Sequence, residues 1–192
     1  MRVLRQLPLL AAFAIVALSA GSAWAEAKFL GNASCEKCHK EIFDSWKKSI
    51  HAKAFDLLAP NTRADKKKEA GLKPAEDYRK DKSCMNCHVM GWDAGGYSFD
   101  KPADEWKGVG CEVCHGAAER YLELHDKKDL AKRDKKLKQA GLTKPLESSG
   151  PGTCATCHYS FDNPYSKIRD KNRERNWADP KWRETYHVAP KK

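Results

Sequence analysis

The sequence has few long aliphatic residues after residue 26, no cysteine outside one short recurring pattern, and no repeat of fixed period. Charged residues dominate the region 26–192 instead. A chain of this composition tends toward disorder unless something other than side chains fills its interior. The lack of a fixed period also excludes a solenoid. We therefore expect one domain, of ordinary size, whose core depends on a bound group.

The main apolar stretch, Leu7–Ala20, has 14 residues, fewer than the roughly 20 that a membrane-spanning helix needs. Two arginines precede it, and the tripeptide AWA at 23–25 has the small-x-small pattern of a cleavage site. We expect residues 1–25 to be a cleaved signal peptide and residues 26–192 to be the exported domain, without a stable membrane anchor. An uncleaved anchor stays open as an alternative, because signal and anchor sequences differ only in degree.

All eight cysteines lie in four copies of the pattern C-x-x-C-H. In this pattern two cysteines attach a haem covalently through thioethers, and the histidine that follows ligates the iron. The sequence therefore predicts four haem c cofactors, each holding an iron. The predicted thioether residues are Cys35, Cys38, Cys84, Cys87, Cys111, Cys114, Cys154 and Cys157, and the predicted proximal iron ligands are His39, His88, His115 and His158.

Disulfides and zinc sites are the two other common uses of such cysteines. Exported proteins often carry disulfides, and C-x-x-C pairs often bind zinc. Neither use explains why a histidine follows the second cysteine in all four copies. We therefore favour haem attachment, and we assign no catalytic residue.

The charge of the chain is basic. The leader holds two of the 36 basic residues and none of the 26 acidic residues, so the remainder has a net charge of +8. Four haems subtract about four charges by formal counting of propionates and ferric iron. Nucleic acid does not suit an exported haem protein, and an acidic docking face on a redox partner is the better match.

The chain between the motifs predicts short helices. Apolar residues at helical spacings favour helix within 45–58 and 120–137. We expect a short helix between loops in 61–82, and turns with at most a short hairpin in 91–109. The expected fold class is mainly α, with short helices and loops wrapped around four haems and little β.

Two lysine-rich segments, 66–68 and 126–138, resemble solvated helix faces. Docking of a partner is the alternative use of these segments.

Three histidines remain for the distal side of the irons: His51, His125 and His187. Histidine on both sides of an iron gives a low-spin centre that suits electron transfer. Four irons need four distal ligands, so the three spare histidines leave one haem without a distal histidine. Met85 sits inside its own motif and Met90 lies just past His88, so neither reaches a distal site. One haem is then five-coordinate, or a lysine or water completes it.

The spacing after the first motif bears on which iron His51 binds. If 45–58 is helical, the 12 residues between His39 and His51 span roughly 18 Å. We therefore expect His51 to ligate the iron of a different motif.

Three segments closely resemble the tetrahaem cytochrome c-554 family: NASCEKCHKEIFDSWKKSIHAKAF at 32–55, DKSCMNCHVMGWDAGGY at 81–97, and GVGCEVCHG at 108–116. The resemblance runs from about residue 27 to residue 158. It implies a mainly helical fold with haems in stacked and roughly perpendicular pairs. The best-known member of the family accepts electrons from hydroxylamine oxidoreductase in ammonia-oxidising bacteria.

The resemblance also implies an assignment of distal ligands. By this similarity His125 pairs with the His39 haem, His51 with the His115 haem, and His187 with the His158 haem. The His88 haem is then the five-coordinate one.

The sequence predicts a monomeric periplasmic electron carrier rather than an enzyme, with a donor and an acceptor that the motifs do not specify. One alternative is reduction of a small ligand such as nitric oxide at the open haem, with Tyr165 or Trp177 leaning over that face. The other is an extracellular haem polymer in which His187 is donated to a neighbouring subunit.

Overall fold

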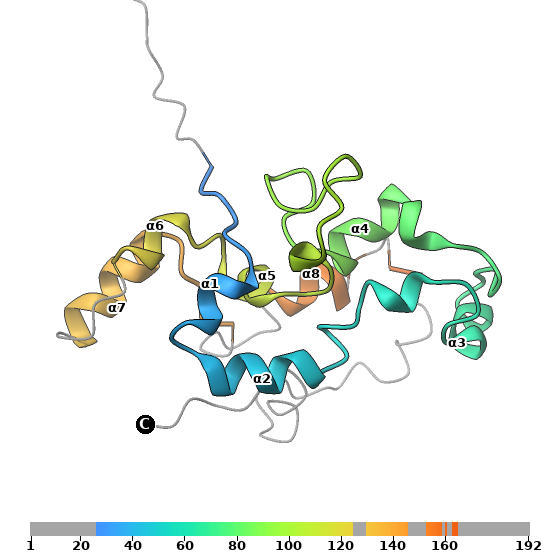
Figure 1. The fold of residues 1–192 in the computed structure, drawn as a ribbon, viewed down its shortest axis with the longest axis horizontal. Helices are drawn as coiled ribbons and strands as arrows, with labels where there is room; N and C mark the ends of the chain where they lie inside the picture. Colours follow the sequence, from blue (N-terminus) through green and yellow to red (C-terminus); the bar gives the residue numbers. More distant parts are fainter. Residues whose placement is uncertain (1–25, 125–129, 146–152, 159, 161–162, 165–192) are drawn as a thin grey trace, which may run out of the picture.

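The structure is a computed structural model that describes residues 26–124, 130–145, 153–158, 160 and 163–164. Over these residues the chain forms short helices joined by turns (Figure 1). The α-helices are α1 (Asn32–Glu36), α2 (Lys40–Lys48), α3 (Ala64–Glu69), α4 (Lys82–His88), α5 (Cys111–His115), α6 (Glu119–Leu122), α7 (Leu130–Gln139) and α8 (Cys154–His158). The 3-10 helices are η1 (Asp56–Leu58), η2 (Tyr78–Lys80) and η3 (Asp104–Trp106).

Strand pairing in this part of the chain is limited to two isolated bridges, Val89 with Lys107 and Ser98 with Lys101. The expected mainly α class is confirmed. The same residues contain no helix that is both long enough and apolar enough to cross a membrane.

The helices that carry the four motifs pack in pairs. Helix α1 lies against α5, and α4 lies against α8. In Figure 1, α5 and α8 occupy the middle of the molecule, whereas α3 and α7 lie at its two ends. Motifs that are far apart in the sequence therefore meet in the centre of the fold.

Two small apolar clusters form the core of the described residues. The first contains Phe55, Leu58, Met85, Val89 and Tyr97 and surrounds the second motif. The second contains Ala118, Tyr121 and Leu137 and lies beyond the third motif. Their small size agrees with the scarcity of aliphatic residues.

The two methionines near the second motif are both completely buried. Met85 packs within the first cluster, and a Cβ built on Gly110 would lie only 2.8 Å from the sulfur of Met90. Both side chains are thus core residues, and their exclusion from the distal sites stays a prediction.

The predicted helix at 45–58 is wrong as a continuous element. Helix α2 begins earlier, at Lys40, and ends at Lys48, and only the short η1 forms near Leu58. Ser49 has an extended backbone, with ψ of 163°, and its Oγ accepts a hydrogen bond from the Ala52 N–H at 3.3 Å. A serine that offers its hydroxyl to a nearby backbone N–H competes with helix formation. His51 therefore lies in a turn, and the 18 Å estimate does not apply.

The other segments agree more closely with the sequence. Helix α3 is the short helix expected in 61–82. The region 91–109 consists of turns, with the Ser98–Lys101 bridge in place of a hairpin. The helix expected in 120–137 is represented by the end of α6 and most of α7, while 125–129 lies outside the described residues.

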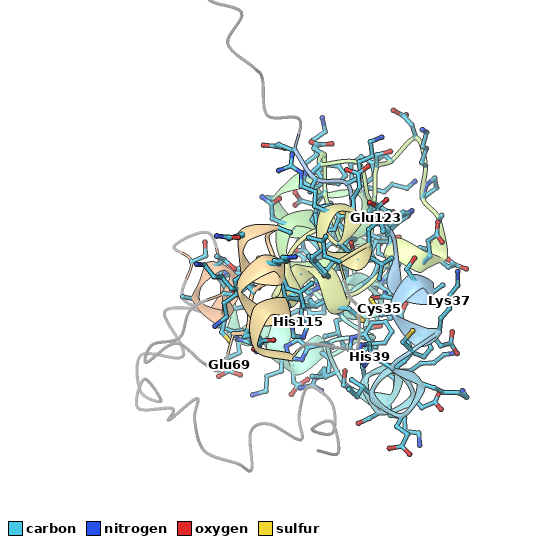
Figure 2. All side chains as sticks on the ribbon, turned by 90° about the vertical axis from the view of Figure 1, so that its left-hand side faces the viewer. Cys35, Lys37, His39, Glu69, His115 and Glu123 are labelled. Carbon is cyan, nitrogen blue, oxygen red and sulfur yellow. The ribbon has the colours of Figure 1, made fainter. Side chains whose placement is uncertain are left out.

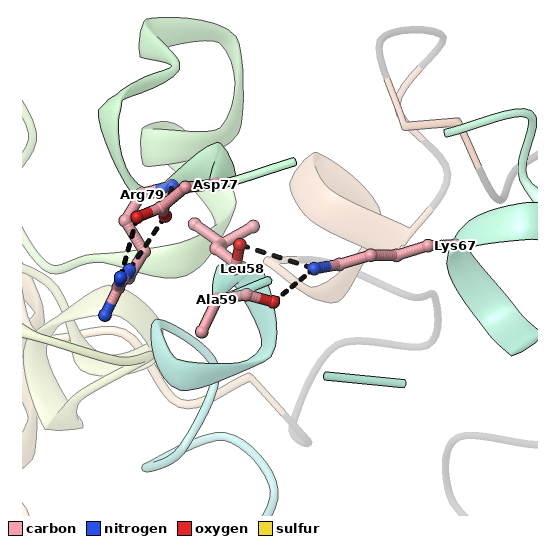
Figure 3. A network of polar contacts seen from close by, with 5 residues as sticks. All are labelled: Leu58, Ala59, Lys67, Asp77 and Arg79. Atoms are coloured by element: carbon pink, nitrogen blue, oxygen red, sulfur yellow. Dashed lines mark hydrogen bonds and ion pairs between the residues drawn. The ribbon is translucent and has the colours of Figure 1, made fainter. Parts of the chain in front are cut away.

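The lysine run of α3 is only partly solvated. Lys66 and Lys68 are exposed, but Lys67 is buried. Its Nζ donates to the carbonyls of Leu58 and Ala59 (Figure 3) and lies 5.5 Å from the centre of the Tyr78 ring. Burial lowers the pKa of Lys67. The prediction of a solvated face is wrong for this residue, because the side chain turns inward to bind two carbonyls of the neighbouring turn.

Gly108 allows the chain to pass close to the turn that contains His51. Its φ is +83°, and an added Cβ would meet the backbone of Ala52 and the His51 carbonyl oxygen, the latter at 3.0 Å. Gly71 has a similar φ of +77° but no atom within 4 Å of such a Cβ. We expect Gly108→Ala to lower the free energy of unfolding by about 3 kcal/mol, because the clash of the Cβ adds to the backbone strain. We expect Gly71→Ala to lower it by about 1 kcal/mol, from backbone strain alone. Denaturant unfolding followed by circular dichroism measures both, and equal losses would contradict the close approach.

Candidate haem sites

All eight cysteines fall within the described residues, and none of them forms a disulfide. Seven are half-buried, and Cys38 is exposed. No group of three or more His, Cys, Asp or Glu residues in the described ranges is arranged to hold a metal ion.

Thiols from different motifs meet. The Cys111 thiol donates a hydrogen bond to Cys35, which lowers the pKa of Cys35 and raises that of Cys111. The same relation joins the fourth motif to the second, where a hydrogen bond from Cys87 lowers the pKa of Cys157 to about 7.

Cys114 connects these two pairs of motifs. Burial raises its pKa to about 11, and the nearby charges of Cys154 and Cys157 add to the increase. The third motif therefore lies next to both the first and the fourth. All four attachment motifs converge on one region of the fold.

Two proximal histidines are oriented as metal ligands. The Nδ1 of His88 lies 2.6 Å from the Ala54 carbonyl oxygen, and the Nδ1 of His115 lies 3.0 Å from the Thr143 carbonyl oxygen. A metal-binding histidine usually donates one ring N–H to such a carbonyl and ligates through the other nitrogen. Burial lowers the pKa of His88, which favours the neutral form that binds a metal. These residues fit a haem iron.

His51 lies beside a proximal histidine of another motif. Its ring centre is 6.0 Å from that of His158, at an interplanar angle of 79°. Two imidazoles on opposite sides of one metal, each at about 2.0 Å from it, have ring centres about 6 Å apart. The backbone of His51 is held by a 2.9 Å hydrogen bond from the Val109 N–H. The structure thus places His51 beside the fourth motif, and its ligation of the His115 haem, which the resemblance implies, stays a prediction.

Of the predicted site residues not yet discussed, His39 is described and the others lie in parts of the chain that the structure does not describe. His39 is described and exposed, at the start of α2. In Figure 2 the labels of Cys35, His39 and His115 lie near one another in the view. His125, His187, Tyr165 and Trp177 lie outside the described residues.

Sequence reasoning missed Glu112, which lies inside the third motif and is only 1% exposed. Its carboxylate accepts hydrogen bonds from the N–H groups of Leu30, Gly31 and Ala118 at 2.7–3.0 Å. Glu36 holds the same place in the first motif, yet it lies on the surface within 3.8 Å of Lys40. Nothing in the motif distinguishes the two glutamates, so no sequence signal identifies the buried one.

A surface groove of about 430 Å³ lies beside the first apolar cluster. Its charged groups are mostly paired: Arg79 binds Asp77 and holds the pKa of that carboxyl at about 2, and Lys107 binds Asp104 at 2.6 Å. The groove is lined by Phe55, Asp77, Arg79, Lys80, Tyr97, Phe99, Pro102 and Lys107.

A mainly helical chain that gathers four C-x-x-C-H motifs, with free thiols and histidines oriented as metal ligands, defines a multihaem c-type cytochrome. Comparison with known proteins agrees. The sequence profile of the family described as cytochrome c554 and c-prime matches residues 34–116.

One relative is the cytochrome c-554 of Nitrosomonas europaea, to which the chain is 39% identical over 158 residues, covering 80% of this chain and 67% of the relative. The solved reduced state of cytochrome c554 from the same organism matches with a TM-score of 0.70 and 32% identity, covering 85% of this chain and 86% of that one. The chain belongs to the cytochrome c554 family. It is an electron-transfer cytochrome with four haem c cofactors.

Proposed function

We propose that this chain is a periplasmic carrier that relays electrons through its four haems. The observation that carries the proposal is the convergence of the motifs, in which α1 packs against α5 and α4 packs against α8. A domain of 167 residues has a radius of gyration of about 15 Å, so four haems attached at one region lie close enough to exchange electrons. The exported domain is 26–192, and residues 1–25 are its signal peptide.

In this proposal the residues divide into three roles. The eight motif cysteines form the thioethers, and His39, His88, His115 and His158 are the proximal ligands. His51, His125 and His187 are the distal ligands. When bound, each haem supplies one-electron chemistry at its iron. The carbonyls of Ala54 and Thr143 orient two of the proximal rings and hold their Nδ1 protons.

The partners are redox proteins that dock and dissociate. The net charge of +8 on residues 26–192 favours partners with acidic docking faces. We propose a monomer, because closed use of the histidines within one chain is simpler than exchange between subunits.

A potentiometric titration tests the proposed function as an electron carrier. We expect several overlapping reduction steps at low potential, because haems with histidine on both sides and partial exposure to water have low potentials. The absorbance of the purified protein, followed against applied potential, measures them. One isolated step at high potential would contradict the proposal.

A second candidate function is reduction of a small ligand at one open haem. The observation that favours it is the histidine count: seven histidines cannot supply two ligands to each of four irons. An open coordination position permits ligand binding but does not ensure turnover. Addition of nitric oxide to the reduced protein, followed by stopped-flow absorbance, should reoxidise the haems if this function holds. Absence of binding and of reoxidation would eliminate it.

A further inference from the structure

The buried carboxylate of Glu112 lies at the junction of the first and third motifs. It follows Cys111 directly in the sequence, and it binds the N–H groups of Leu30 and Gly31, which lead into α1. Its third contact is the N–H of Ala118, just beyond the third motif. One side chain thus joins the two segments that attach two of the haems.

The hydrogen bonds of Glu112 are those of a carboxylate. Every contact is a backbone N–H donor, and both carboxylate oxygens accept. None of these N–H groups can accept a hydrogen bond, so each of them is matched by a carboxylate oxygen. Among the described residues no Lys, Arg or His forms an ion pair with this carboxylate. Within the part of the chain that the structure describes, this buried carboxylate therefore has no neutralising cation.

We propose that Glu112 lowers the reduction potentials of the two haems attached at the first and third motifs. A buried negative charge stabilises the ferric form, which has one positive charge more than the ferrous form. Water and salt screen such a charge weakly. A unit charge about 10 Å from a redox centre changes its reduction equilibrium constant on the order of tenfold at an effective dielectric constant of about 20.

This inference rests on the proposed attachment of haems at these motifs. It adds a difference in reduction potential between the haems. Two of the four, those of the first and third motifs, are biased toward the oxidised state. The haems of the second and fourth motifs are attached on the other pair of helices, α4 and α8, and because Glu112 bonds only to the segments of the first and third motifs, we expect them to experience less of this charge. Electrons that enter the chain then accumulate on the haems of the second and fourth motifs.

The test is spectroelectrochemistry of the holoprotein carrying Glu112→Gln, which keeps the shape and removes the charge. We expect two of the four reduction steps to move to higher potential, each by about a tenfold change in its equilibrium constant, while the other two stay in place. Glu112→Asp keeps the charge and should leave all four steps near their native positions. Glu119→Gln is a matched control, because this carboxylate also binds the N-terminal segment, at the Lys28 N–H, but is exposed and paired with Lys28.

A variant that adds a negative charge, where Glu112→Gln removes one, keeps the test decisive if Glu112→Gln does not retain four haems. Asn32 is buried at the same junction, and its Oδ1 accepts from the Cys111 N–H at 2.8 Å. Asn32→Asp adds a negative charge with little change of shape and should lower the same two potentials. No shift in either charge-changing variant, or equal shifts for Glu112→Gln and Glu112→Asp, would overturn the inference. Loss of haem from the native protein would instead contradict the proposed function.

Discussion

Replacement of His51 with alanine is expected to convert one low-spin ferric haem into a high-spin haem. The ring of His51 lies 6.0 Å from that of His158, a separation suited to two ligands of one iron. The native ferric protein should show one high-spin and three low-spin signals in electron paramagnetic resonance, because one haem lacks a second histidine. The variant should show two of each. All four haems should remain attached, since the thioethers do not depend on His51.

Ser49→Ala is the matched control for this substitution. It removes the hydrogen bond from the Ala52 N–H within the same turn but no iron ligand, so the native spectrum should persist. An unchanged spectrum in His51→Ala would show that this histidine does not bind an iron. Four low-spin signals in the native protein would point to a lysine as the sixth ligand of the haem at His88.

Replacement of Glu112 with alanine is expected to lower the free energy of unfolding by about 3–5 kcal/mol. Three N–H groups, of Leu30, Gly31 and Ala118, lose their acceptor. Each buried donor left without a partner costs about 1–3 kcal/mol, and water entering the cavity recovers part of that loss. For a domain of this size the midpoint of thermal unfolding should fall by roughly 10 °C.

Glu119→Ala provides the comparison for the stability measurement. Its carboxylate also binds a backbone N–H, that of Lys28, but on the surface, so a loss below about 1 kcal/mol is expected. Thermal unfolding followed by absorbance and circular dichroism measures both variants. Similar losses in the two would mean that the buried carboxylate does not hold the α1 and α5 segments together.

The four haem c cofactors could be predicted from sequence because their attachment needs contiguous residues. Two thiols and an imidazole must meet one porphyrin, so C-x-x-C-H identifies Cys84, Cys87 and His88 without knowledge of the fold. The mainly helical class and the short helix α3 also followed from local composition. These features depend on neighbours within a few residues.

The features that sequence reasoning missed depend on distant contacts. Glu112 binds Leu30, which lies 82 positions away in the chain, and no local sequence pattern indicates that contact. Lys67 turns inward only because η1 presents two carbonyls to it. The contact of the His51 ring with the His158 ring likewise depends on how α8 packs against α4 and on a turn in place of the expected helix.

The central claim is that electrons pass among four haems within one chain, and injection of a single electron tests it most directly. A flash-generated reductant at a concentration far below that of the protein reduces one haem in a small fraction of molecules. The absorbance should then change as the electron moves to the haems of higher potential, at a rate independent of protein concentration. A rate that rises in proportion to protein concentration would show that electrons pass only between molecules, and would contradict the relay.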